Sequence, residues 1–421
     1  MDLEELENFL TDIHQNIQKI NKGNVANYIP ELGKVNPDLF GISVCTSSGK
    51  IIEIGNTDID FCLQSTSKPF SYCIAREKLG RNKVHSHVGY EPSGQAFNAF
   101  VLNKQGLPHN PMINAGAIMI ASLLEPDKEP SERFNLIKDS YSNIAGNLGK
   151  IGFDNSVFLS EKQHADRNMS LAYYMRENGA FNGLISPNKI QEHLDLYFQC
   201  CSILINCKIG AIMSATLANG GICPINNKKI FNIDTIKDCL TLMYGCGMYD
   251  YSGQFAFEIG LPAKSGVSGC IMLVIPNKMG VCIWSPPLDE QGNSVRGIKV
   301  CEEIVEKYNY HIFGKIVKNK LELDDLSEES LIHQSITAAS SNNLEIMTSL
   351  IGKVDFNKGD YDKRTPLHLA STEGHVKMVK FLLENKVNKS PRDRWDNTPL
   401  LNIKNKEGDN FNTIRQLLQE E

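Results

Sequence analysis

The chain has 421 residues, of which 41% are apolar and 22% are charged, and its formal net charge is −6. This length exceeds one ordinary hydrophobic core, so we expect two or three domains. The mild acidic excess gives no electrostatic reason to expect nucleic acid or a membrane surface as partner, and no apolar run approaches the roughly 20 residues that span a bilayer. We expect a soluble protein, and small, diffusible ligands stay open.

Cysteine usage and the first residues indicate a reducing compartment. The twelve cysteines are spread along the chain and none forms a CxxC pair, so we expect free, buried thiols rather than disulfides or a zinc site. The start, MDLEELENFL, is acidic and lacks the apolar core of a signal peptide. The sequence therefore predicts a cytoplasmic protein. His85 and His87 form an HxH pair, which we expect to be a surface pair rather than a metal site.

In chain order, the first part of the sequence predicts a helix, a hairpin and a long helical region. Residues 1–22 have the pattern of an acidic amphipathic helix. The β-branched segments 40–45 and 51–55 flank the turn signal SSGK and predict a β-hairpin. From about residue 71 to residue 250 the sequence is mainly helical, with long loops between the helices.

Strands return near the end of this part of the chain. CIMLVIP (270–276) and VCIW (281–284) predict two strands around the turn NKMG, and a helix over 298–308 follows. Strands, then helices, then strands indicate one antiparallel sheet with a helical cluster inserted between its two halves. We therefore expect an α+β domain over 23–315 with helices on both sides of the sheet.

The last hundred residues contain an internal repeat. The composition becomes polar and charged in KIVKNKLELDDLSEES, and we assign residues 316–329 to a linker. DYDKRTPLHLA and DRWDNTPLLNI place Thr365 and Thr398 33 residues apart, which is the ankyrin period, and a weaker copy covers 338–352. We therefore expect α-helical ankyrin repeats over 330–421. Either a protein-binding surface or a stabilising appendage fits this tail.

The stretch LQSTSKPF, residues 63–70, places Ser65 three residues before Lys68 at the start of a predicted helix. Positions i and i+3 share one helix face, so the amine stands beside the hydroxyl. Serine needs a base to become a nucleophile, and a semi-buried lysine can have a pKa low enough to serve at neutral pH. Alone the motif is weak, because SxxK also occurs in ordinary capped helices.

A second motif supports acyl transfer by a serine. SxxK acyl-transfer enzymes pair that helix with a KTG-like triad on a neighbouring strand. Here Lys264-Ser265-Gly266 lies just before the strand CIMLVIP. Gly266 and Gly269 let the backbone approach a ligand closely, and a strand N–H there can supply a second oxyanion donor beside the amide of Ser65.

With these two motifs, the sequence resembles the serine-dependent glutaminase family, whose catalytic domain is similar to the β-lactamase and penicillin-binding fold. The resemblance covers roughly residues 24–310, and with the ankyrin repeats it is similar in architecture to the animal glutaminases. The matching segments are NYIPEL, LQSTSKPF, GYEPSGQAFN, HNPMINAGAI, DRN, LDLYFQCCS, TLANGGICPI, CGMYDYSGQFAFEIGLPAKSGVSGC and WSPPLDEQGNSVRG.

The resemblance implies a site, residue by residue. It places the nucleophile on Ser65, the base on Lys68 and a catalytic tyrosine on Tyr249. It places the second oxyanion donor on the backbone of Val267. The remaining substrate contacts that it implies are Tyr28, Asn114, Glu161, Asn168 and Tyr197.

The implied substrate is L-glutamine, and the chemistry of these side chains suits it. Glu161 can hold the ammonium group, while Asn114 and Asn168 can donate to the α-carboxylate. We expect Ser65 to attack the γ-amide carbonyl, a tyrosine–lysine relay to protonate the departing ammonia, and water to hydrolyse the glutamyl-enzyme. No cofactor or metal is needed.

The resemblance also carries expectations about regulation and assembly. The loop GYEPSGQAFNAFVLNK is similar to the loop that gates the site in animal glutaminases, and Phe97 and Phe100 could pack there. A homo-oligomer, a tetramer by resemblance, is expected. The start of the chain is short compared with the mitochondrial forms, which argues against a mitochondrial location. We therefore keep the mitochondrial location of the animal relatives as the alternative to a cytoplasmic one.

Two other functions fit part of the sequence. A penicillin-recognising hydrolase shares the SxxK and KSG motifs, although the segments around Asn114, Glu161 and Asn168 argue against it. An ankyrin scaffold with a dead catalytic domain is the non-enzyme alternative, and intact Ser65 and Lys68 argue against that.

Overall fold

The computed structural model describes residues 3–186, 189–314 and 328–419. The chain divides into two compact units, Met1–Gly314 and Lys315–Glu421. Within the described residues, no helix combines the length and the apolar character needed to cross a membrane.

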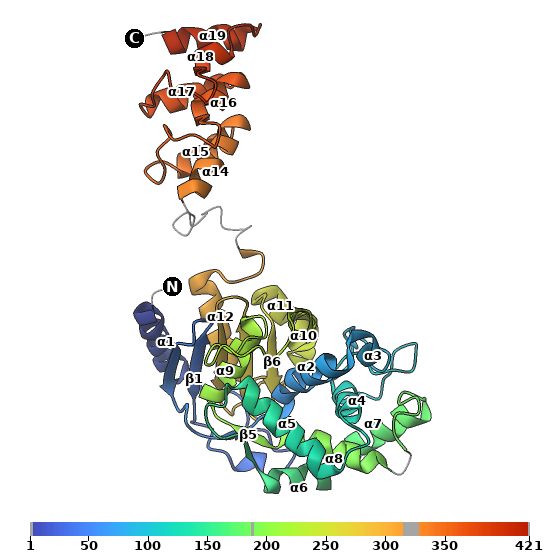
Figure 1. Cartoon of the computed structure of the whole chain (residues 1–421). Helices are drawn as coiled ribbons and strands as arrows, with labels where there is room; N and C mark the ends of the chain where they lie inside the picture. Colours follow the sequence, from blue (N-terminus) through green and yellow to red (C-terminus); the bar gives the residue numbers. More distant parts are fainter. Residues whose placement is uncertain (1–2, 187–188, 315–327, 420–421) are drawn as a thin grey trace. The chain divides into compact units, whose positions relative to one another are not determined.

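A five-stranded antiparallel sheet forms the centre of the first unit (Figure 1). Its strand order is β2-β1-β8-β7-β6, so the hairpin from the start of the chain pairs with strands from the end of the unit. This confirms the predicted sheet. The strands are β1 (Gly41–Thr46), β2 (Ile51–Gly55), β6 (Ala263–Gly266), β7 (Cys270–Ile275) and β8 (Met279–Trp284).

Helices cover both faces of this sheet. Side chains alternate between the two faces along each strand, so each face presents apolar side chains that pack against helices. Along β7, Ile271 and Leu273 pack in one apolar cluster with α1 and α12, whereas Met272 and Val274 pack in another with α9. All residues of β1, β7 and β8 are buried. The bounds are α1 (Leu3–Ile17), α9 (Cys207–Ala218) and α12 (Val295–Tyr308).

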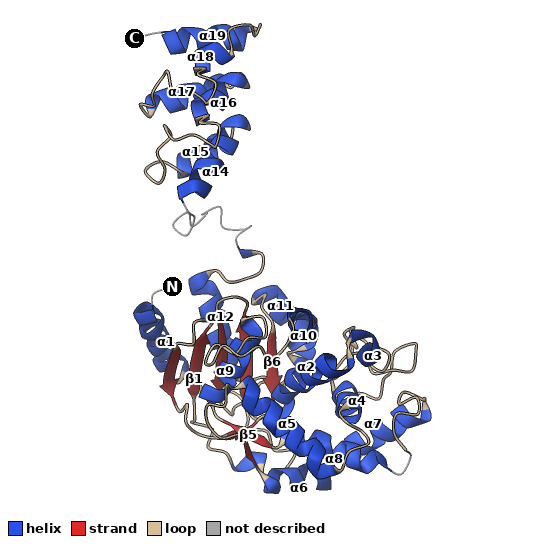
Figure 2. Cartoon of the chain, viewed as in Figure 1, coloured by secondary structure: helices blue, strands red, loops and turns tan. Residues whose placement is uncertain are grey.

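The inserted helical cluster lies on the α9 side of the main sheet and packs around a small second sheet, whose strand β5 is labelled in Figure 2. That sheet has the order β3-β5-β4, with β3 (Phe61–Cys62), β4 (Gly152–Phe153) and β5 (Ile203–Ile205). The helices of the cluster are α2 (Lys68–Leu79), α3 (Arg81–His85), α4 (Asn114–Leu123), α5 (Pro130–Ile144), α6 (Asn155–Gln163), α7 (Asp166–Glu177), α8 (Ile190–Cys201) and α10 (Ile233–Cys246). Helix α11 (Ser252–Glu258) follows α10, and its Phe255 packs in the apolar cluster of α1 and α12.

The N-terminal helix α1 is shorter than the predicted 1–22 and is part of the core. Leu6, Leu10, Ile13 and Ile17 are buried at helical spacing and pack with α12 and β2. The acidic residues occupy the opposite face, which is the amphipathic pattern expected for a surface helix.

The second unit is helical and has its own apolar core, which includes Leu367, Met378 and Leu382. Thr365 and Thr398, the threonines of the repeat, each cap a helix that starts with proline. Its helices are α14 (Glu328–Ser340), α15 (Leu344–Ser349), α16 (Pro366–Thr372), α17 (Val376–Glu384), α18 (Pro399–Asn402) and α19 (Asp409–Gln419).

Candidate active site

Ser65 lies in a tight 3-10 turn, Gln64–Ser67, that leads directly into α2. Side chains at i and i+3 eclipse in a 3-10 turn, so Ser65 and Lys68 leave it on the same side. The turn packs between β6 and α8. Its hydroxyls are fixed, because Thr66 donates to the carbonyl of Leu63 at 2.6 Å and Ser67 donates to that of Gln64 at 2.7 Å. The backbone that presents Ser65 is therefore rigid.

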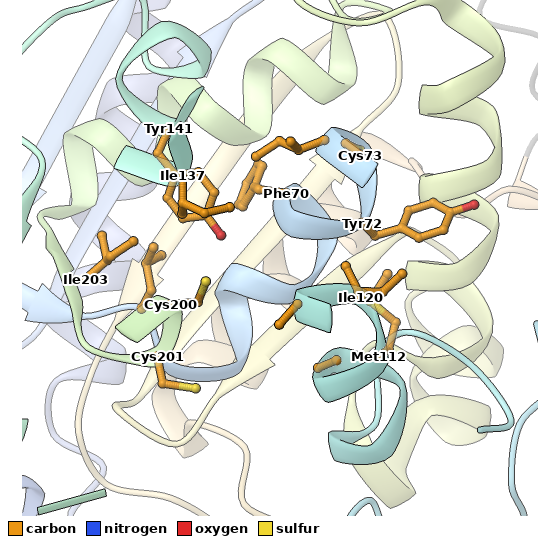
Figure 3. Packing of buried hydrophobic residues seen from close by; sticks show 14 of the residues in the cluster. Phe70, Tyr72, Cys73, Met112, Ile120, Ile137, Tyr141, Cys200, Cys201 and Ile203 are labelled. Carbon is orange, nitrogen blue, oxygen red and sulfur yellow. The ribbon is translucent and has the colours of Figure 1, made fainter. Parts of the chain in front are cut away.

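Packing of apolar side chains around α2, the helix that follows the turn, reinforces this rigidity (Figure 3). Phe70 and Tyr72 on α2 are buried in the same apolar cluster as Cys200 on α8 and Tyr141 on α5. The Tyr141 hydroxyl donates to the carbonyl of Ser67 at 3.0 Å. The first turn of α2 is thus held by a side chain from α5.

Lys68 is 2% exposed, and its Nζ donates to Asn114 Oδ1 at 2.8 Å. Burial lowers the pKa of Lys68 from 10.5 to about 8, so a substantial neutral fraction exists at mildly alkaline pH. Asn114, the first residue of α4, in turn donates to Asn168 Oδ1 on α7 at 3.0 Å. Among the described residues the hydrogen bond of Lys68 goes to Asn114 and not to Ser65.

The Tyr249 hydroxyl lies close to the Ser65 side chain. Tyr249 begins the 3-10 turn Tyr249–Tyr251 with a left-handed φ of 54°, which is an uncommon conformation for an aromatic residue. Burial raises the pKa of Tyr249, while the Ser65 side chain and the Val267 backbone oppose that rise. The buried hydroxyl has no hydrogen bond of ordinary geometry. It is therefore available for exchange of a proton with a bound molecule.

Glu161 forms the acidic end of the site. It accepts hydrogen bonds from the Tyr28 hydroxyl at 2.5 Å and from Gln64 Nε2 at 3.0 Å. Burial raises the pKa of Glu161, and these two bonds partly offset the effect. The Tyr28 side chain is 49% exposed, although its hydroxyl reaches the buried carboxylate. Tyr197 on α8 is buried nearby, and the charge of Glu161 raises its pKa further after burial.

The structure thus brings the sequence-predicted residues into two connected groups. Lys68, Asn114 and Asn168 form one chain of hydrogen bonds, and Tyr28 with Glu161 forms another. Tyr249 in addition lies close to the Ser65 side chain and the Val267 backbone.

The sequence did not identify Gln64 or the amine of Lys264 as site components. Gln64 directly precedes Ser65, has a left-handed φ of 49°, and joins Glu161 to the Ser65 turn through its side chain. The position of its side-chain amide directly before Ser65 in the sequence was the signal that could have identified it. Lys264 had been placed only in the KSG motif, and its amine lies 4.5 Å from the centroid of the Tyr249 ring.

A cavity of about 490 Å³ lies beside the site, between the segment 92–97 and residues 245–253. Tyr249 and Phe97 both line it, their ring centroids are 4.8 Å apart, and Ser65 does not line it. Phe97 thus packs against a site tyrosine. Phe100 instead contacts Tyr174 and stacks under Arg167 on α7. The loop therefore joins the site to α7.

The prediction that His85 and His87 form a surface pair is wrong. His87 is buried, and burial lowers its pKa. His85 is half-buried and bonds the Tyr72 hydroxyl at 2.9 Å and the carbonyl of Val88 at 3.0 Å. His85 thus joins the end of α3 to Tyr72 on α2, and His87 lies in the interior.

The state of the cysteines agrees with the prediction made from the sequence. All twelve are free and all but Cys246 are buried, which confirms free thiols. In the described ranges, no group of three or more His, Cys, Asp or Glu residues is arranged to hold a metal ion.

Comparison with known proteins gives one family for each unit. The model of the family "Glutaminase" matches residues 23–313, and the model of ankyrin repeats, three copies, matches residues 327–421.

Individual relatives agree. The rat "Glutaminase liver isoform, mitochondrial" is 44% identical over 406 residues, which cover 95% of this chain and 67% of that protein. A glutaminase from Nostoc is 46% identical over 305 residues, which cover 72% of this chain and 89% of the relative. A probable glutaminase from Bacillus subtilis, solved in complex with 6-diazo-5-oxo-L-norleucine, superposes with a TM-score of 0.65 at 32% identity and covers 73% of this chain and 96% of that one. The chain spans about two thirds of the length of its animal relatives.

Proposed function

Because the chain belongs to the glutaminase family, we propose that its first unit hydrolyses L-glutamine to L-glutamate and ammonia through an acyl-enzyme on Ser65. One observation carries this proposal. A buried lysine with a lowered pKa follows Ser65 by three residues, and a buried tyrosine hydroxyl with no fixed partner faces the same serine. The catalytic domain that we propose covers residues 23–315.

In the first step, Ser65 Oγ attacks the side-chain carbonyl of glutamine and Lys68 receives the hydroxyl proton. The neutral amine that this requires is supplied by burial of Lys68. Its bond to Asn114 fixes the direction of the amine. A bound substrate can draw the amine and the hydroxyl together, since catalytic hydrogen bonds often tighten only in the complex.

The negative oxygen of the tetrahedral intermediate needs two N–H donors. The amide of Ser65 lies in the first turn of a helix, where N–H groups have no helical partner. Val267 follows Gly266, the last paired residue of β6, so its amide lies just beyond the ladder. These two amides are the proposed oxyanion donors, and each is worth on the order of 100-fold in rate.

Collapse of the intermediate breaks the carbon–nitrogen bond, and ammonia leaves with a proton. Tyr249 is the proposed donor of that proton, reloaded by Lys68. The reverse sequence activates water for hydrolysis of the glutamyl ester and returns the proton to Ser65. No step requires a metal or a cofactor.

The charged ends of glutamine fit the two groups of polar residues. The carboxylate of Glu161 is held by Tyr28 and Gln64 and can take the substrate ammonium group. Asn114 and Asn168 are already joined by a hydrogen bond and can donate to the α-carboxylate. Tyr197 on α8 is buried near Glu161 and is a further candidate for contact with the substrate.

Release of glutamate and ammonia from glutamine tests the proposal. Ser65→Ala should reduce turnover by at least about 1,000-fold, because no other group replaces the nucleophile. Ser140→Ala is a matched control, since Ser140 on α5 is bonded only to its own helix. Undiminished turnover by Ser65→Ala, or turnover of a β-lactam in preference to glutamine, would overturn the assignment.

For the second unit we propose a protein-binding surface. Tyr361 and Trp395 are 88% and 60% exposed, and their ring centroids lie 5.3 and 5.4 Å from the Arg394 guanidinium. Exposed Tyr, Trp and Arg are the residues that most often dominate binding at protein interfaces. Arg394→Ala should weaken binding of a partner without changing glutamine turnover.

Assembly and location are proposed from likeness alone. We propose a homo-oligomer, and specifically a tetramer. Light scattering after gel filtration would then give four times the mass of one chain. A cytoplasmic location and the mitochondrial one that the rat and mouse relatives carry in their names are separated by fractionation of cells that express the full-length protein.

A further inference from the structure

Lys264 is a buried cation that the proposed mechanism does not use. It is 0% exposed, and its Nζ donates to the carbonyl of Gly247 at 2.9 Å and to that of Ser265 at 2.7 Å. Among the described residues, no carboxylate forms an ion pair with it. A buried ammonium group without a counter-ion is costly, so its retention calls for a reason.

The amine clamps the segment before Tyr249 onto β6. The carbonyl of Gly247 accepts from both Lys264 Nζ and the amide of Ser265. The contact is so close that a Cβ on residue 247 would lie 1.8 Å from the carbonyl oxygen of Ala263, which explains the glycine. Two residues later, Tyr249 has its left-handed backbone. Such a conformation costs on the order of 1–3 kcal/mol and persists only where the surroundings enforce it.

The same amine also contacts the tyrosine itself. Nζ lies 4.5 Å from the ring centroid of Tyr249, within the range of a cation–π interaction. An ammonium group has three N–H donors and no acceptor. Two donors reach the carbonyls, and the ring face lies where the third can point. A protonated amine satisfies all three contacts.

We propose that Lys264 is a positioning residue for Tyr249: its ammonium group ties Gly247 to β6, holds the phenol toward Ser65, and supplies a positive charge that favours release of the phenol proton. The inference rests on the proposed function. It gives the KSG motif a role beyond its glycines.

The titratable groups that face Lys264 are Lys68 from α2, Cys246 from α10, Cys270 from β7 and Tyr249. Burial and then the charge of Lys68 lower the pKa of Lys264. The two backbone carbonyls and the face of the Tyr249 ring oppose this effect, because each of them favours the protonated amine.

The test compares kcat and KM of glutamine turnover in Lys264→Met, Lys264→Gln and Lys264→Arg, with Lys208→Met as control. Lys208 pairs with Glu53 at the surface. The two uncharged variants should lose about 100-fold in kcat with little change in KM. Lys264→Arg keeps a positive charge and N–H donors and should retain more activity than either of them. Equal losses of kcat in all three variants, or a loss expressed mainly in KM, would overturn the proposal.

A double-mutant cycle tests whether Lys264 acts through Tyr249. In the Tyr249→Phe background, Lys264→Met should cost little further activity, whereas multiplied losses would refute the inference. If both uncharged variants lose the circular-dichroism signal of the fold while Lys264→Arg keeps it, Lys264 serves stability alone and the proposal fails. These outcomes are separate from failure of the proposed function, which turnover by Ser65→Ala would show.

Discussion

With Lys68 as the proposed base, the pH dependence of turnover follows from the burial of its amine. Burial lowers its pKa to about 8 from 10.5, so at pH 7 about a tenth of the molecules carry the neutral amine. An unperturbed lysine would be neutral in about 0.03% of molecules at that pH. The shift therefore raises the reactive population about 300-fold, and the protein supplies it only by exclusion of water.

The expected profile is an acidic limb in which log kcat/KM rises with unit slope to a midpoint near pH 8. Between pH 7 and pH 8 the rate should increase about fivefold, because the neutral fraction rises from about a tenth to about a half. Initial rates of glutamate release in constant-ionic-strength buffers from pH 6 to pH 9 measure it. Far-ultraviolet circular dichroism at each pH serves as control for unfolding.

A rate that is flat from pH 6 to pH 9 would refute this reasoning, because the base would then not titrate in that range. A midpoint at pH 10 or above would show that Lys68 is solvated in solution. A midpoint near 8 that persists in an active Lys68→Met variant would assign the titration to another group.

Three further predictions follow from buried groups. The pKa of Lys68 is lower in the folded state, so folding is penalised below pH 8 and the penalty vanishes above pH 10.5; the full penalty is about 3 kcal/mol. Lys68→Met should therefore be inactive yet more stable than wild type at pH 7. The expected gain is about 2 kcal/mol, because loss of the hydrogen bond to Asn114 costs about 1 kcal/mol of the removed penalty. A lower urea midpoint than wild type would contradict this. Glu161→Gln should raise KM for glutamine about 100-fold through loss of the ammonium partner, and an unchanged KM in initial-rate kinetics would argue against that role. Leu10→Ala should cost about 3 kcal/mol in urea unfolding, because α1 is part of the core, whereas the exposed Leu159→Ala should change little.

The fold was largely predictable because its signals are local. The β-branched hairpin, the two apolar strands and the 33-residue repeat each lie within a short window, and the sheet follows from their order. The length of the first helix was overestimated, since the helix ends at Ile17 although Ile20 beyond it still packs against the core.

The site was predictable where residue order carries the chemistry, and less so where space does. Ser65 and Lys68 are three residues apart, so their proximity is visible in the sequence. Gln64 reaches Glu161 across 97 positions, and Lys264 reaches the Tyr249 ring from another element. No spacing rule reports such contacts. His87 was misassigned because the sequence does not show that the chain turns inward after α3.

Direct detection of the covalent intermediate tests the central claim. The protein is treated with 6-diazo-5-oxo-L-norleucine, an electrophilic analogue of glutamine, digested, and analysed by mass spectrometry. The account predicts a single added mass on Ser65 in the peptide that contains LQSTSKPF, lost in Ser65→Ala and prevented by excess glutamine. A label on any other residue, or an unlabelled and inactivated protein, would contradict it.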